Sequence, residues 1–442
     1  MPAFPRIGST RAVAVLFVAL GLIAAAQPAM AAATEEASAA GQADGATKTA
    51  LFTPGDAGYP TFRMEALAVT NQGTILAFTE GRKGGNGVWG DVDLLLRRSI
   101  DGGKTWRPIQ VAVDAGPNTV CYPSPLVDRT TGRIWLAMGR YRAPADQGTI
   151  SREEPPDTSH VWICHSDDDG ATWSAPIDIT DHAKPPGTTW HGVGAGYGIQ
   201  LRSGRLVYPC YHFRAAPHDR GRRHESSVFY SDDHGRTWKL GGIVNRYAPE
   251  TEVDAEMTKE ERFRAGRGWM IPGRTDEAQV VELVDGRLLI NMRSYHFAYR
   301  RAISHSEDGG LSWSPVTLDE ALFEPVCSGS IARLTSTLDG YRRNRILFAG
   351  PNGRRPAGHR FIREQLTLHL SYDEGKTWPV EKVLEPGFAG NLNMLALPDK
   401  RIAVLYESGE NYRETIYFAS CTLEWLADGK DRLERDELQA ED

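Results

Sequence analysis

The chain has 442 residues, of which 41% are hydrophobic, so it can bury a sizeable core in one large domain or a few ordinary ones. The formal net charge of -7 argues against a nucleic-acid-binding protein, although it leaves room for a locally basic pocket. Beyond the N-terminal segment, no stretch of the sequence is long and apolar enough to suggest a membrane span.

The N-terminal segment, residues 1–31, has the pattern of a cleavable secretion signal. Two arginines precede an apolar run from Ala12 to Ala26 that is short for a membrane span. Ala29-Met30-Ala31 has the small-x-small pattern of a cleavage site, so we expect the mature chain to begin near Ala32. This predicts a secreted or periplasmic protein without a membrane partner after cleavage; a retained membrane anchor is the alternative.

The remaining chain is expected to form a single domain over residues 50–427. Residues 32–49 are small and polar and predict a disordered linker, and the charged tail, residues 428–442, is expected to fray. The five cysteines are scattered without metal-ligand spacing, so we expect small buried hydrophobes in strands. The sequence predicts no metal site and no cofactor.

A turn motif, S-x-D-x-G-x-[T/S]-W, occurs five times, at intervals of about 65 to 75 residues. The copies are Ser99–Trp106, Ser166–Trp173, Ser231–Trp238, Ser306–Trp313 and Ser371–Trp378. The aspartate is suited to accept backbone N–H groups of its own turn, and the glycine supplies a positive φ. The hydroxyl residue adds a local bond and the tryptophan packs the turn onto a sheet, so the motif is interpreted as structural.

Each copy follows a short run with strand character, and further strand pairs lie between the copies. Helical periodicity is confined to one short charged segment, Met257–Ala265. About four strands per repeat and no regular helices predict an all-β fold, a six-bladed β-propeller. One blade is expected to be closed by strands from both chain ends. Functional residues should then lie near strand ends, at one end of the central channel.

Several charged residues occupy such positions. Arg63, Arg293 and Arg363 stand near the ends of predicted strands, and Glu277 begins another strand. Guanidinium groups bind carboxylates in a bidentate manner and stay charged at all physiological pH values. If the three arginines meet, they form a site for an anionic group.

The stretches TILAFTEGR, GDVDLLLRRS, GYGIQLRSGRLVYPC and DEAQVVELVDGRLLINMRSY, together with the repeated turns, resemble the bacterial exo-sialidases in the same order. The resemblance runs from about residue 61 to about residue 426 and implies a six-bladed propeller with Asp-box turns. It implies that Arg63, Arg293 and Arg363 hold a substrate carboxylate. It also implies that Arg82 lies near the pocket rim and that Glu277 matches the catalytic glutamate.

Two positions depart from that family's pattern. The position of the family's tyrosine nucleophile holds Asn391, and the position of its acid/base aspartate holds Val88. Asparagine cannot form the covalent intermediate, and valine cannot protonate a leaving oxygen. The proline that follows the first arginine in the family is replaced by Glu65, which is two residues after Arg63 and therefore on the same strand face.

Three functions remain open at this stage. The first is a sialidase-like hydrolase that removes a terminal sialic acid or related acidic sugar from a glycan, with Glu277 as base or charge partner. Glu65 and Glu277 would act as an acid/base pair in direct hydrolysis by water. The second is a uronate-glycan lyase in which His191, Tyr211 or His212 abstracts a proton beside a carboxylate. The third is a catalytically inactive propeller that only binds an acidic sugar.

Overall fold

The computed structural model describes residues 39–43, 45–85, 87, 89–143, 145, 150, 158–214, 223–245, 273–295, 299–353, 363–410 and 414–436. The chain divides into two compact units, residues 1–35 and 36–442, and the fold below is that of the second unit. The predicted signal segment and the predicted helix Met257–Ala265 lie outside the described residues. None of the helices in the described ranges has the length and apolar character of a membrane span.

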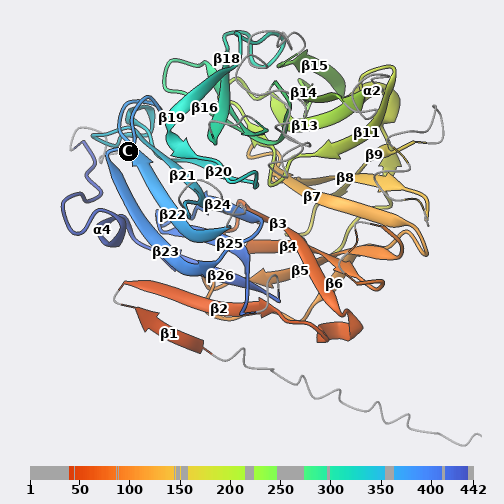
Figure 1. The fold of residues 1–442 in the computed structure, drawn as a ribbon, viewed down its shortest axis with the longest axis horizontal. Coiled ribbons are helices and arrows are strands. Elements are labelled where there is room, and N and C mark those ends of the chain that lie inside the picture. The colour runs from red at the N-terminus through yellow and green to blue at the C-terminus, as the bar shows by residue number, and fades with distance from the viewer. Residues whose placement is uncertain are drawn as a thin grey trace, which may run out of the picture. The chain divides into compact units, whose positions relative to one another are not determined.

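The fold is an all-β, propeller-like assembly of antiparallel strand groups that follow one another around a common centre (Figure 1). The first groups are β3 (Thr61–Val69), β4 (Ile75–Arg82), β5 (Val92–Ser99) and β6 (Gln110–Val113), then β7 (Thr119–Val127), β8 (Ile134–Tyr141), β9 (His160–Ser166) and β10 (Ile177–Asp178). The third holds β11 (Thr188–Val193), β12 (Ile199–Gln200), β13 (Leu206–Arg214), β14 (Arg223–Ser231) and β15 (Lys239–Ile243).

The later groups repeat this arrangement. They are β16 (Thr275–Glu282), β17 (Leu288–Ser294), β18 (Arg300–Ser306) and β19 (Thr317–Phe323), then β20 (Ser330–Thr335), β21 (Arg345–Pro351), β22 (Glu364–Ser371) and β23 (Val380–Phe388), and finally β24 (Leu392–Ala396), β25 (Ile402–Ser408) and β26 (Thr415–Cys421). Short helices are η1 (Asp56–Gly58), α2 (Thr180–Ala183), η3 (Thr337–Asp339) and α4 (Leu423–Leu426). The first strands of the groups contact one another, β3 with β7 and β24, and β20 with β16 and β24, so they form the inner ring.

A six-bladed propeller is predicted from the sequence, whereas the described strands hydrogen-bond into five sheets. A parallel bridge between Val92 of β5 and Thr119 of β7 joins β3–β6 and β7–β10 into one eight-stranded sheet. The spacing of the turn motif predicts how often an antiparallel group of strands recurs along the chain. It does not predict whether two neighbouring groups are joined by a backbone hydrogen bond.

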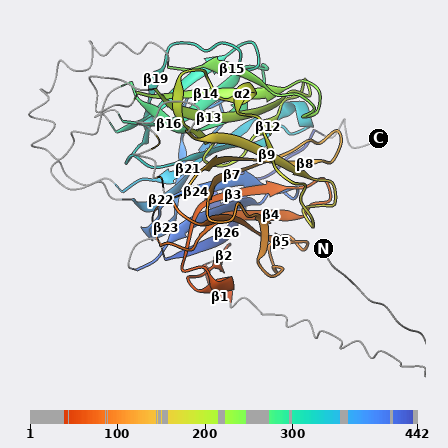
Figure 2. The same ribbon diagram turned by 90° about the vertical axis from the view of Figure 1, so that its right-hand side faces the viewer.

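The prediction that strands from both chain ends close one sheet is confirmed. β2 (Ala46–Phe52) pairs antiparallel with β26, and the full order is β1-β2-β26-β25-β24, with β1 at Ala39–Ala43 (Figure 2). The predicted disordered linker is therefore wrong for β1 and for the start of β2. Its small polar side chains carry little hydrophobic signal, but the unpaired edge of β26 supplies backbone partners for β2.

The charged tail is also more ordered than predicted. Asp431 is only 7% exposed and accepts two hydrogen bonds from the guanidinium of Arg345, from Nε at 2.7 Å and from Nη2 at 2.6 Å. Arg435 forms an isolated β-bridge with Tyr341. The buried Arg345 needs an ionic partner, and Asp431 provides it, so the tail packs back onto the fold as far as this bridge.

The repeated turns have the predicted chemistry. Asp101 accepts backbone N–H bonds from Lys104 at 3.1 Å and Thr105 at 2.9 Å, and hydroxyl bonds from Ser99 and Thr105. Although burial raises the pKa of Asp101, these hydrogen bonds outweigh it and lower the pKa to about 2. Trp106 packs edge-on against Phe418, with ring centroids 5.0 Å apart, and so ties its turn to the neighbouring sheet.

The inner strands are buried on both faces. Every residue of β3 except Val69 is buried, and every residue of β4 is buried, because each inner strand packs between two neighbouring groups. The five cysteines are all free and buried, as predicted, and four of them lie in strands. Charged side chains on these inner strands therefore sit in a low-dielectric setting, where each needs a partner.

Candidate functional site

A buried ion pair connects the first inner strand with the last sheet. Arg63 on β3 donates from Nε to Oε1 of Glu407 on β25 at 2.5 Å, and the side chains are 8% and 1% exposed. Burial alone would lower the pKa of Arg63, but Glu407 outweighs it and raises the pKa above its usual value. One guanidinium edge is thus fixed by a protein carboxylate.

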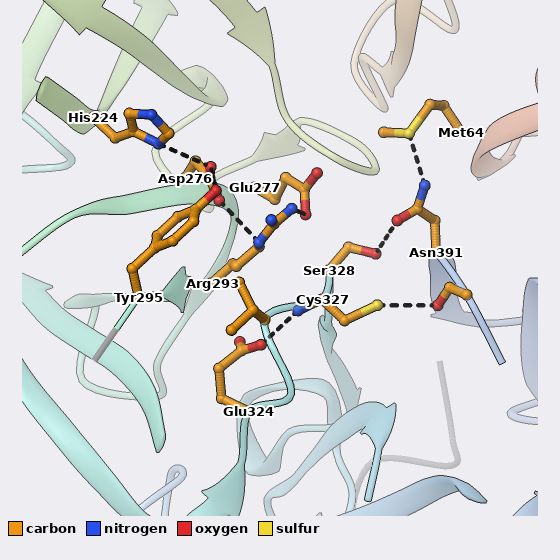
Figure 3. A network of polar contacts seen from close by, with 12 residues as sticks. Met64, His224, Asp276, Glu277, Arg293, Tyr295, Glu324, Cys327, Ser328 and Asn391 are labelled. Atoms are coloured by element: carbon orange, nitrogen blue, oxygen red, sulfur yellow. Dashed lines mark hydrogen bonds and ion pairs between the residues drawn. The ribbon is translucent and has the colours of Figure 1, made fainter. Parts of the chain in front are cut away.

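Asn391, directly before β24, extends this pair toward a neighbouring loop (Figure 3). Its Nδ2 donates to Oε1 of Glu407 at 3.3 Å and lies 2.8 Å from the Sδ of Met64. Its Oδ1 accepts from the hydroxyl of Ser328 at 3.3 Å. Asn391 therefore acts here as a bridge between strands and is 4% exposed.

A second ionic group lies on β16 and β17. Arg293 donates from Nη1 to Oε2 of Glu277 at 2.6 Å, and its Nε lies 3.5 Å from Oδ1 of Asp276 (Figure 3). Asp276 accepts from Tyr295 at 2.6 Å and lies 3.2 Å from Nδ1 of His224. Burial opposes ionisation of Asp276, but Arg293, followed by His224 and Tyr295, outweighs it and lowers the pKa of the carboxyl.

The loop before β20 brings the third arginine into the same region. Arg363 donates from Nη2 to the carbonyl of Val326 at 2.7 Å, and the neighbouring Cys327 lies 3.3 Å, through Sγ, from the carbonyl of Gly390. Burial raises the pKa of the Cys327 thiol; Arg363 and Arg293 oppose this rise and Glu277 adds to it. Arg363 therefore contacts the loop that carries this buried thiol.

Arg63 reaches this loop through Glu407, Asn391 and Ser328, the last of which is next to Cys327 in the chain. Contacts thus link Arg63, Asn391 and Arg363 through the loop of residues 326–328, while Glu277 and Arg293 form a separate pair. The five residues come from five separate segments of the sequence, and all of them lie at or near strand ends.

Arg82 and Glu65 lie close to Arg63 but in different settings. Arg82 is fully buried, and its Nε and Nη2 donate to Oε2 of Glu80 at 2.8 and 2.5 Å, so it is part of the packed interior and not of a rim. Neither carboxyl oxygen of Glu65 has a hydrogen-bond partner among the described residues. Burial, followed by the nearby Glu407, raises the pKa of Glu65 well above its usual range.

The two predicted histidines are placed elsewhere. His212 lies 2.9 Å from Oε2 of Glu225 and 3.2 Å from the hydroxyl of Ser227, and it is fully buried. The ring of His191 lies parallel to it at 6.4 Å, and burial lowers the pKa of His191 well below its usual value. The suggestion that these histidines meet the arginines is corrected, because His212 faces the Glu225 side of β13.

Tyr211 points to the opposite face of β13 from His212, as alternation along a strand requires. It packs on Tyr122 with ring centroids 5.8 Å apart, and burial, followed by Tyr122 and the charges of Glu277 and Asp276, raises its pKa well above its usual value. Tyr211 therefore lies in the aromatic cluster that contains Tyr122. Val88, the position of the missing acid/base residue, lies outside the described residues.

Sequence reasoning missed Glu407, Asp276 and Tyr122. Glu407 directly follows the apolar residues of its strand. A charged residue next to such a run is the one sequence signal that points to a buried ion pair. Asp276 precedes Glu277 directly, so regular alternation along a strand would place the two side chains on opposite faces of the sheet. A local irregularity in β16, described below, removes that alternation.

Across the described residues there is no group of three or more histidine, cysteine, aspartate or glutamate side chains arranged to hold a metal ion. Arg63 is paired with Glu407 and Arg293 with Glu277 and Asp276, whereas Arg363 contacts the carbonyl of Val326. Such an arrangement is suited to exchange a protein carboxylate contact for one with an anionic ligand.

Residues 73–415 match the BNR repeat-like domain family. The chain is 34% identical to the sialidase of Micromonospora viridifaciens over 441 residues, which cover 96% of this chain and 61% of that protein. It is 30% identical to the sialidase of Bacteroides fragilis over 371 residues, covering 80% of this chain and 61% of that protein. The chain thus spans about three fifths of the length of these two relatives.

A solved structure, the Hadza microbial sialidase Hz136, superimposes with a TM-score of 0.70 at 26% sequence identity. The match covers 86% of this chain and 69% of that one. The likeness therefore extends over most of the strand groups.

Proposed function

This chain belongs to the BNR repeat-like domain family, and we propose that it is an exo-acting glycoside hydrolase that removes a terminal sialic acid or related acidic sugar from a glycan. What supports the proposal is a set of three buried or half-buried arginine contacts: Arg63 with Glu407, Arg293 with Glu277, and Arg363 with the Val326 carbonyl. Its similarity to two sialidases supports the same assignment. We count the eight-stranded sheet as two blades, so the propeller that we propose has six.

The arginines would hold the sugar carboxylate. Each already has one protein acceptor: Glu407 for Arg63, Glu277 for Arg293 and the Val326 carbonyl for Arg363. These contacts hold each guanidinium in position and leave further N–H donors, because a guanidinium carries five. A permanent positive charge in a dry site binds a carboxylate more strongly than the same charge does in water.

The chemical step would use the carboxyl groups of Glu277 and Glu65, which lie in different surroundings. Glu277 is ion-paired with Arg293, whereas Glu65 has no hydrogen-bond partner among described residues and burial favours its protonated form. Water would attack the anomeric carbon and give a proton to Glu277, while Glu65 gives a proton to the leaving oxygen as the glycosidic bond breaks. Asn391 offers no nucleophile, so this route predicts inversion at the anomeric carbon.

The direct test is hydrolysis of a fluorogenic sialoside by the purified mature chain. Glu277→Gln keeps the size of the side chain but removes the base, and we expect kcat to fall by about 100-fold or more. Glu320→Gln, at a side chain that is 86% exposed on β19, is the matched control and should leave kcat unchanged. No turnover of any acidic glycoside by the wild-type chain would reject the proposal.

The two rival functions have separate readouts. A uronate lyase would create an absorbance near about 230 nm through proton abstraction, and hydrolysis products without it would eliminate the lyase. Its proposed base His212 is engaged with Glu225, which does not favour that route. A pure binding protein would bind the acidic sugar, weaken on Arg293→Ala, and release no product on long incubation.

We also propose that the protein is exported. The basis is the charged, then apolar, then small-residue pattern of residues 1–31. Mass spectrometry of the protein recovered from the periplasm or medium should give an N-terminus near Ala32. An intact N-terminus in the cytoplasm would contradict export.

A further inference from the structure

Four inner strands, β3, β7, β11 and β16, contain a step in which the pairing advances by three residues on that strand and by two on its neighbour. β11 has no positive φ at its step, which runs from Thr188 to His191, and β3, β7 and β16 differ from it in this respect. In β3 the step runs from Arg63 to Ala66, against Glu80 to Phe78 on β4. In β7 it runs from Cys121 to Ser124, against Gly139 to Ala137 on β8. In β16 it runs from Asp276 to Gln279, against Arg293 to Asn291 on β17. Each strand therefore contains one extra residue, which is the definition of a β-bulge.

The residue that follows the last regular pair has a positive φ in β3, β7 and β16. The angles are +61° for Met64, +56° for Tyr122 and +38° for Glu277. This backbone conformation is strained for a residue with a side chain and persists only where the surroundings enforce it. Its repetition at equivalent positions of three strands points to a common purpose, which in bulges is to redirect a side chain.

Two of these three side chains already belong to the site. Met64 contacts the Nδ2 of Asn391 through its sulfur, and Glu277 accepts from Arg293 (Figure 3). The equivalent position on β7 holds Tyr122. Tyr122 packs in one apolar cluster with Met64, and it is 6% exposed, the same fraction as Glu277. Its place in the bulge is therefore the same as that of Met64 and Glu277 in theirs.

The backbone of Tyr122 is held in place by a hydrogen bond to a buried glutamate. Its N–H donates to Oε1 of Glu80 at 2.8 Å, and the other oxygen of Glu80 accepts the fork of Arg82. This gives the buried Arg82 a role in supporting the bulge. Burial, followed by the charge of Glu277, raises the pKa of Tyr122 above its usual value, so the phenol stays protonated and acts as a hydrogen-bond donor.

We infer that Tyr122 is a substrate-contacting residue that determines sugar specificity: its phenol donates a hydrogen bond to a hydroxyl or acyl oxygen of the bound acidic sugar, while the arginines hold the carboxylate. This inference rests on the proposed function. It gives the three bulges one purpose, since each supplies a different group to the same bound sugar: a thioether, a phenol and a carboxylate.

The test compares Tyr122→Phe with Tyr141→Phe. Tyr141 is a fully buried phenol of the same apolar cluster but lies outside the bulges, so it controls for the loss of a buried hydroxyl. The measurements are the Kd of free N-acetylneuraminic acid by titration calorimetry, and KM and kcat on a fluorogenic sialoside. Tyr122→Phe should raise Kd and KM by about 5- to 10-fold, the loss of one hydrogen bond, with Tm unchanged.

A set of N-acetylneuraminic acids, each lacking one hydroxyl or the acyl oxygen, identifies the contact. The penalty of Tyr122→Phe should vanish for the analogue that lacks the accepting oxygen and persist for the others. A purely structural role would give the same penalty on every analogue and would overturn the inference. The inference would also be overturned if Tyr122→Phe had the same Kd and KM as the wild type, provided that the wild-type chain binds and hydrolyses the sialoside. Failure of the wild-type chain to bind or hydrolyse any acidic sugar would instead remove the proposed function, and the inference with it.

Discussion

The Nε of Arg63 lies 2.5 Å from Oε1 of Glu407, although the two residues are 344 positions apart in the chain. β3 and β25 belong to different sheets, so this ion pair links the beginning and the end of the propeller-like unit. The same carboxylate accepts from Nδ2 of Asn391. The orientation of the first arginine therefore depends on the closure of the fold.

Glu407→Gln should release Arg63 from this orientation. The amide keeps the size of the side chain but removes the charge, and a charge-assisted bond is about twice as strong as a neutral one. We expect KM for a sialoside to rise by about 10-fold, with a smaller change in kcat. Glu385→Gln is the control, because Glu385 is also an ion-paired carboxylate, with Lys48, but lies on β23. Unchanged KM in Glu407→Gln would show that Arg63 does not depend on its partner.

Glu65→Gln should change how stability depends on pH. The folded pKa of Glu65 is raised well above its usual value of 4.5, so the folded state binds the proton more tightly than the unfolded state. The wild-type chain then loses stability as the pH rises from about 4.5 toward the folded pKa. Glu65→Gln removes this loss, so its Tm should exceed that of the wild type at pH 7 and approach it near pH 4. A constant Tm difference across this range would contradict the burial of an ionisable Glu65.

The same variant tests the chemical step separately. If Glu65 protonates the leaving oxygen, Glu65→Gln should hydrolyse a substrate with a poor leaving group about 100-fold more slowly. A substrate with an activated aryl leaving group needs less protonation and should be affected less. Equal losses on both substrates would assign Glu65 a structural role, and the ratio of the two kcat values measures this directly.

Asp233→Ala should destabilise the fold without affecting activity. Asp233 accepts from Ser231 at 2.7 Å and from the N–H and hydroxyl of Thr237 at 2.9 and 2.6 Å. We expect Tm to fall by about 1 °C, which corresponds to roughly 1 kcal/mol in a chain of this size. The adjacent Asp232→Ala breaks only a surface ion pair with Arg205 and should shift Tm far less. Equal Tm shifts in the two variants would mean that the hydrogen bonds of the turn add nothing to the stability of the fold.

The cysteines should be unreactive in the folded protein. All five are free and buried, and burial raises the pKa of Cys164, Cys210 and Cys421 to about 12. The thiolate is the reactive form, so a disulfide reagent at pH 8 should label none of them in the native state and all five after denaturation. Rapid labelling of any thiol under native conditions would contradict the burial of that residue.

The arginines and Glu277 were predicted from the sequence because they stand near strand ends, and strand ends of a propeller meet at its channel. Their joint action on one ligand stays a prediction, since Arg63 pairs with Glu407, Arg293 with Glu277, and Arg363 with the carbonyl of Val326. The histidines were assigned to the site for the same reason, but His212 lies on the strand face that carries Glu225. Sequence position identifies a strand end, whereas the neighbouring strand decides what each face meets.

The sequence by itself determined the five repeated turns, the all-β class and the burial of the cysteines, because these depend on bonds within a few residues or on side-chain polarity. Only the tertiary structure decided the number of sheets, the pairing of Arg63 with Glu407, and the packing of the tail through Asp431. It also decided the three bulges at Met64, Tyr122 and Glu277. The physical reason is that these features depend on contacts between distant strands, whose register and faces no local pattern specifies.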